Sequence, residues 1–145
     1  MSFIYLDTSG LVKLLVAEEG SDSMRVWWNE SEATTCRTTY PEARAALAAA
    51  LRDGRLSSVG LRDAKADLEV RWDQMDIVEV TDTLTRQAGV LAEKHSLRAY
   101  DSVHLGAALS LEDEDLVVVT WDKRLGRAAQ DAGLAVAPPV VAYAD

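Results

Sequence analysis

Short apolar runs alternate along the chain with longer segments in which apolar residues recur every three or four positions. The short runs are typical of buried strands, whereas the longer pattern is typical of helices with one buried face. The predicted strands cover residues 3–6, 33–36, 77–80, 116–119 and 134–136, and the predicted helices cover residues 10–16, 39–52, 58–72, 82–94, 101–111 and 122–131. This alternation predicts an α/β fold in which a central, mainly parallel sheet of four to five strands is flanked by helices on both faces.

Residues that favour helix ends support several of these boundaries. Thr8 or Ser9 is the expected N-cap of the first helix, and Pro41 lies near the start of the second. Gly54 and Gly133 follow predicted helix ends, where glycine is common. No linker, repeat or low-complexity segment interrupts the pattern, so we expect a single domain over residues 1–145.

The composition is that of a small globular domain, with 145 residues, 48% of them hydrophobic and 27% charged. No signal peptide or bilayer-spanning run is recognisable, and we expect a cytoplasmic protein. The single cysteine, Cys36, is expected in the core. The net charge of −9 disfavours a nucleic-acid partner unless a metal neutralises part of it, and it equally suits a basic partner protein.

Acidic residues follow two of the predicted strands. Asp7 comes directly after the first strand, and Asp122 comes shortly after the run at residues 116–119. Sites in open parallel sheets form beyond the carboxyl ends of the strands, so the two carboxylates share a crevice if these strands are neighbours. The simpler interpretation is that each aspartate caps the helix that follows it.

Two further acids, Glu42 and Asp101, open predicted helices at the head of an apolar stripe, which directs them toward the sheet edge. First-turn acids are also favoured by the helix dipole, and for either residue alone that is the simpler account. The coincidence of four such acids favours a functional cluster.

Clustered carboxylates require a cation or a proton, because a pair about 4 Å apart costs roughly 4 kcal/mol at an effective dielectric of about 20. Oxygen ligands without His or Cys favour Mg²⁺, with Mn²⁺ as the alternative. His95 and His104 lack zinc spacing; we expect His95 at the surface and His104 in a structural or substrate-side role. Such a site suits phosphodiester hydrolysis, and no glycine-rich phosphate loop or nucleophile elbow offers another chemistry.

The segments around the four acids resemble PIN-domain nucleases. The matching segments are residues 3–9, residues 40–42 with the alanine-rich stretch after them, residues 98–108 and residues 119–134. Each motif is weak alone, but together they run in order through nearly the whole chain and are specific. The chain length is similar to that of VapC-type toxins from bacterial toxin–antitoxin pairs.

This resemblance implies a three-layer PIN-like domain and a Mg²⁺-dependent endoribonuclease. It also implies a homodimer that is inhibited by a VapB-like antitoxin. By position, Asp7 and Asp101 would be the main metal ligands, and Glu42 and Asp122 would complete the site directly or through water. Hydroxyl groups that would orient carboxylates or water belong to Thr8, Ser9 and Thr120.

Aromatic and basic residues also lie near the expected site, and the sequence allows more than one role for the aromatic ones. Trp121 either stacks on a base or packs in the core, and packing is preferred. Of Trp27 and Trp28, at least one is expected in the core, whereas an exposed pair would indicate a dimer or antitoxin groove. The basic residues that would guide RNA are Lys13, Arg37, Arg44, Arg98, Lys123 and Arg124.

Other functions remain as alternatives. A PIN-domain nuclease of RNA processing outside a toxin pair would use the same acids. A receiver-like phospho-acceptor domain would have a similar fold, but the third strand is followed by Glu79, Val80, Thr81 and Asp82 without the expected acceptor setting. A catalytically inactive module that binds a basic partner is less consistent with the complete acid set. A haloacid-type phosphatase would need a second aspartate, which the segment at residues 7–9 lacks.

Overall fold

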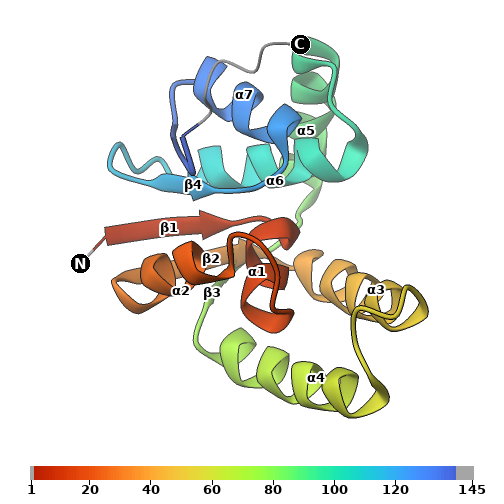
Figure 1. Cartoon of the computed structure of the whole chain (residues 1–145). Helices are drawn as coiled ribbons and strands as arrows, with labels where there is room; N and C mark the ends of the chain where they lie inside the picture. Colours follow the sequence, from red (N-terminus) through yellow and green to blue (C-terminus); the bar gives the residue numbers. More distant parts are fainter. Residues whose placement is uncertain (1, 140–145) are drawn as a thin grey trace.

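The computed structural model describes residues 2–139, and within this range five parallel strands form one sheet in the order β3-β2-β1-β4-β5 (Figure 1). The strands are β1 (Ser2–Leu6), β2 (Ser31–Cys36), β3 (Asp76–Val78), β4 (Val117–Val119) and β5 (Ala135–Ala137). The predicted parallel sheet is therefore confirmed. The order reverses beside β1, which pairs with both β2 and β4, so the crevice typical of ligand sites in such sheets opens between β1 and β4.

Helices cover both faces of this sheet. They are α1 (Thr8–Leu15), α2 (Ser21–Asn29), α3 (Thr39–Arg52), α4 (Ser58–Asp73), α5 (Asp82–His95), α6 (Ala99–Ser110) and α7 (Lys123–Asp131). Figure 1 shows α5, α6 and α7 together on one side, with α1 to α4 on the other. No helix within residues 2–139 is long and apolar enough to cross a membrane.

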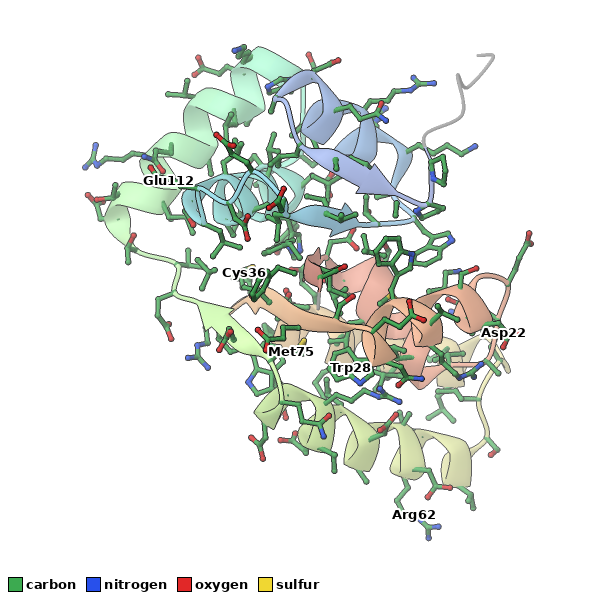
Figure 2. All side chains as sticks on the ribbon, turned by 90° about the vertical axis from the view of Figure 1, so that its left-hand side faces the viewer. Asp22, Trp28, Cys36, Arg62, Met75 and Glu112 are labelled. Atoms are coloured by element: carbon green, nitrogen blue, oxygen red, sulfur yellow. The ribbon has the colours of Figure 1, made fainter. Side chains whose placement is uncertain are left out.

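The three layers follow from the alternation of side chains along buried strands. Ile4 and Leu6 face a core built with α1, α2, α3 and α4, whereas Tyr5 between them faces a core built with α5, α6 and α7. Figure 2 shows the same division for Cys36 and Met75, which lie on opposite sides of the sheet. Because both faces are covered, most of β1 and all of β4 are apolar in the sequence, whereas β2 contains Glu32, Thr34 and Thr35.

The structure departs from the sequence-based expectations at several places. Helix α2 was not predicted: its N-cap is Gly20, at φ 94° and without a capping side chain, and only Ser21 and Met24 of the helix are buried. The N-cap of α1 is neither Thr8 nor Ser9 but Asp7, whose side chain accepts the Gly10 N–H, as the simpler interpretation of Asp7 proposed. Strand β3 ends at Val78 instead of residue 80.

The tryptophans pack against the core. Trp27, Trp28 and Trp121 are partly buried against the cluster under α1 to α4, which confirms the packing preferred for Trp121. The guanidinium of Arg71 lies 5.1 Å from the centroid of the Trp28 ring. Trp27 and Trp28 therefore do not form an exposed aromatic pair.

We predict that Gly20→Ala destabilises the protein more than Gly54→Ala does. Both glycines have positive φ, which costs an alanine about 1 kcal/mol, but a Cβ at Gly20 would also lie 2.8 Å from Trp121 Nε1, whereas one at Gly54 would meet nothing within 4 Å. We expect a loss of about 1 kcal/mol in unfolding free energy for Gly54→Ala and about 2–4 kcal/mol for Gly20→Ala, measured by urea denaturation. Equal losses would contradict the tight contact with Trp121.

Candidate active site

The four acids that the sequence singles out line one cleft. It lies beyond the carboxyl ends of β1 and β4 and has a volume of about 440 Å³. Its lining residues are Asp7, Thr8, Ser9, Glu42, Arg98, Tyr100, Asp101, His104 and Asp122. Each acid lies at the N-terminus of a different helix, where the helix dipole favours negative charge.

Asp7 is the most strongly held of these acids. It is 4% exposed, and its Oδ1 accepts hydrogen bonds from the Ser9 hydroxyl at 2.7 Å and the Gly10 N–H at 3.0 Å. Its Oδ2 accepts one from the Thr120 hydroxyl at 2.6 Å. Burial raises the pKa of the Asp7 carboxyl, and the charge of His104 and the three hydrogen bonds offset only part of this increase.

Thr120 connects the end of β4 to Asp7. Its hydroxyl donates its single hydrogen to Asp7 and accepts the Asp122 N–H at 3.0 Å. The Ser9 hydroxyl similarly donates to Asp7 and accepts the Trp121 N–H at 2.9 Å. Two hydroxyl groups thus orient both carboxylate oxygens of Asp7, although Thr120 itself does not line the cleft.

Asp101 and Asp122 share a cationic neighbour. The Arg98 guanidinium lies 3.3 Å from Asp101 Oδ2 and 3.6 Å from Asp122 Oδ2. Asp122 also caps α7 by accepting the Leu125 N–H at 3.0 Å, as the simpler sequence interpretation proposed. Burial and the charge of Asp122 raise the pKa of Asp101, and Arg98 and His104 oppose this increase.

Glu42 meets His104, whose role the sequence left open. His104 is 3% exposed; its Nε2 lies 3.1 Å from Glu42 Oε1, and its Nδ1 lies 2.8 Å from the Tyr5 hydroxyl and 3.7 Å from Cys36 Sγ. Burial by itself would lower the pKa of His104, but hydrogen bonds to Cys36 and Glu42 outweigh it and raise the pKa to about 10. Burial alone would raise the pKa of Cys36, but the hydrogen bond to His104 and the charge of His104 lower it to about 6, so the two groups favour each other's charged forms. Cys36 is buried as predicted, and it belongs to this contact network.

The donor set of the cleft fits a hard divalent cation. Its acidic donors are carboxylate oxygens, and the Thr8 hydroxyl is buried without a hydrogen-bond partner among the described residues. Within residues 2–139, however, the side chains as they stand form no group of three or more His, Cys, Asp or Glu residues close enough to hold a metal ion. Arg98 and His104 supply the neutralising charge in this arrangement.

We predict that replacing His104 by glutamine removes a pH-dependent stabilisation. The pKa of His104 is raised to about 10 and that of its partner Cys36 is lowered to about 6, so the folded pair holds one proton between about pH 6 and 10. With the ordinary values of 6.5 and 9.0 the unfolded pair also holds one proton between about pH 6.5 and 9, so the difference in unfolding free energy between the wild type and His104→Gln should stay nearly constant over this range and fall only as the pH rises from about 9 toward 10. His95→Gln is the control, and a difference that falls steadily between pH 6.5 and 9 would contradict the coupling of His104 to Cys36.

Comparison with known proteins identifies the family of the chain. The sequence model of the PIN domain matches residues 4–131. The chain is 45% identical over 139 residues to ribonuclease VapC45 of Mycobacterium tuberculosis, which covers 95% of this chain and 96% of the relative. It is 33% identical over 139 residues to ribonuclease VapC46 of the same species, with 96% and 99% covered.

Solved structures share the fold. PAE2754 of Pyrobaculum aerophilum superposes with a TM-score of 0.70 at 21% identity, over 93% of this chain and 83% of the other. VapC20 of M. tuberculosis, described as a toxin that cleaves the sarcin-ricin loop, gives a TM-score of 0.68 at 16% identity, over 91% and 96%. The chain belongs to the PIN-domain family and, within it, to the VapC ribonucleases.

Proposed function

We propose that this chain is a metal-dependent endoribonuclease and the toxin of a VapBC-type toxin–antitoxin pair. The observation that carries the proposal is the convergence of Asp7, Glu42, Asp101 and Asp122, from four separate elements, on one cleft in a chain of the VapC family. Hydrolysis of RNA phosphodiester bonds is the reaction that such a family site supports.

The four carboxylates would hold Mg²⁺, with Mn²⁺ as a substitute. A bound ion would supply a Lewis acid for the scissile phosphate and a water of lowered pKa. The residues of the chain prepare the ligands: Ser9 and Thr120 orient Asp7, and His104 orients Glu42.

Arg98 has two successive roles in this proposal. Its side chain is 70% exposed and lies between the carboxylates of Asp101 and Asp122. If Asp101 and Asp122 held a metal ion, they would no longer need the charge of Arg98, and its guanidinium would be available to a phosphate of the substrate. The overall charge of −9 is then compatible with RNA binding, because the negative charge at the cleft is compensated locally.

The proposed partners are an RNA substrate, a VapB-like antitoxin and a second copy of the chain. Solved structures of similar fold include VapBC-1 from nontypeable Haemophilus influenzae, at a TM-score of 0.61 and 16% identity over 92% of this chain and 96% of the other. Because the substrate is cellular RNA, the proposed place of action is the cytoplasm. Family membership removes the basis for a phospho-acceptor domain and leaves an RNA-processing role as the second candidate.

We predict that Asp7→Asn and Asp101→Asn each abolish cleavage of total bacterial RNA. Each variant removes a negative ligand without changing side-chain size. Mn²⁺ should raise the melting temperature of the wild type, because it binds only the folded state, and should do so much less for either variant. EDTA should stop cleavage by the wild type, and Mg²⁺ should restore it.

Asp73→Asn is the matched control, since Asp73 is an exposed acid at the end of α4. It should leave cleavage and the Mn²⁺ response unchanged. Full activity of the purified Asp101→Asn protein would refute the assignment, as would cleavage that is indifferent to the chelator.

We predict that Thr120→Val weakens Mn²⁺ binding, because Asp7 Oδ2 loses the hydroxyl that donates to it at 2.6 Å. Loss of a group that orients a metal ligand costs about 10- to 100-fold in affinity, measurable by calorimetry. Thr120→Ser keeps the hydroxyl and should bind Mn²⁺ nearly as the wild type does. Equal affinity of the valine and serine variants would show that this hydrogen bond is irrelevant to metal binding.

A further inference from the structure

A second hollow adjoins the acidic cleft and has a different character. Its lining is mainly apolar, and its volume is about 460 Å³. The residues around it are Thr8, Thr38, Pro41, Glu42, Ala45 and Tyr100. Thr8, Glu42 and Tyr100 also line the acidic cleft, so the two hollows share a wall.

Tyr100 stands at this shared wall with its ring in solvent. It precedes Asp101 in the first turn of α6, yet Asp101 is 8% exposed and Tyr100 is 65% exposed. Within residues 2–139 its hydroxyl has no hydrogen-bond partner. An aromatic side chain left in water beside a cleft offers a flat apolar surface that becomes buried only when a ligand arrives.

The other lining residues select the class of ligand. Pro41 and Ala45 are apolar and small. None of the residues that line this hollow is basic, and Glu42 at its edge repels anions, which disfavours a phosphate group. An unpaired nucleobase suits this lining, because it is uncharged and has a flat face for the Tyr100 ring.

We propose that this second hollow is a base-binding subsite, in which an unpaired base beside the scissile phosphate stacks on Tyr100. The inference rests on the proposed ribonuclease function and deepens it. The acidic cleft holds the phosphate to be cleaved, and the adjoining hollow holds a neighbouring base in single-stranded RNA. Stacking of this kind tolerates several bases.

The test begins with a random-sequence library of single-stranded RNA that is cut by the wild type, with the cut sites read by sequencing. A preferred substrate is then made in versions that lack the base at one position on either side of the cut. One of these abasic substrates should raise the KM of the wild type about 5- to 150-fold, the range expected for the loss of one stacked base.

Tyr100→Ala should raise the KM for the intact substrate by the same factor and should no longer distinguish it from that abasic substrate. Tyr100→Phe keeps the ring and should behave as the wild type. Ala45→Leu fills the hollow without changing Tyr100, and it should also raise KM and remove the abasic penalty. Phe3→Ala is the control, since Phe3 is an aromatic residue, 46% exposed, at the amino end of β1.

The results separate this inference from the proposed function. If the wild type cleaves RNA and Tyr100→Ala keeps the abasic penalty at every flanking position, the subsite is refuted and the ribonuclease stands. If Tyr100→Phe loses as much as Tyr100→Ala, the hydroxyl and not the ring is responsible, which also overturns stacking. If the wild type cleaves no RNA, the proposed function itself fails. Each variant is compared by melting temperature, so that loss of folding is not mistaken for loss of binding.

Discussion

The parallel pairing of β1 with β4 is the constraint on which the cleft depends. The register places Leu6 opposite Val119, so the residues that follow, Asp7 and Thr120, leave the sheet side by side. Two hydrogen bonds fix the position of Thr120. Its N–H donates to Ala137 O of β5 at 3.0 Å, and its hydroxyl donates to Asp7 at 2.6 Å. A register shift of one residue would turn each side chain of β4 to the opposite face and would separate these groups.

The balance of charge in the cleft is the second determinant. Four carboxylates lie at helix N-termini, and two cations of different kinds face them. His104 is 3% exposed, so the charge that it carries when protonated lies inside the fold. Arg98 is 70% exposed, so its charge can be exchanged for that of another cation. Part of the positive charge that neutralises the four carboxylates therefore lies inside the fold, and the rest can be supplied by a bound ligand.

In the proposed function, the acidic cleft binds the phosphate backbone of RNA and the adjoining hollow binds a base. Carboxylates and Arg98 suit the phosphate backbone, which carries charge and little sequence information. Tyr100, Pro41 and Ala45 offer an apolar wall without charge. Because Thr8 and Glu42 border both hollows, a ligand that occupies one is positioned by the same residues that border the other.

Much of the fold was predictable from the sequence because its signals are local. Strands β1 and β4 are mainly apolar runs, and helices that cover the sheet have a periodic apolar stripe. Helix α2 was missed because Gly20 carries no capping side chain and few residues of the helix are buried. The N-cap of α1 was left open because Asp7, Thr8 and Ser9 all have capping side chains, and only the backbone path decides which one reaches the Gly10 N–H.

The sequence by itself determined which residues are acidic and that each stands at the start of a helix or the end of a strand. Tertiary structure alone decided which of them meet. Tyr5 contacts His104 across 99 residues, Glu42 contacts the same histidine across 62, and Thr120 contacts Asp7 across 113. The position of Tyr100 between two hollows is likewise a product of α3 and α6 coming together. Such contacts depend on strand order and register, which are set by the packing of the whole chain and leave no periodic trace in the sequence near any one residue.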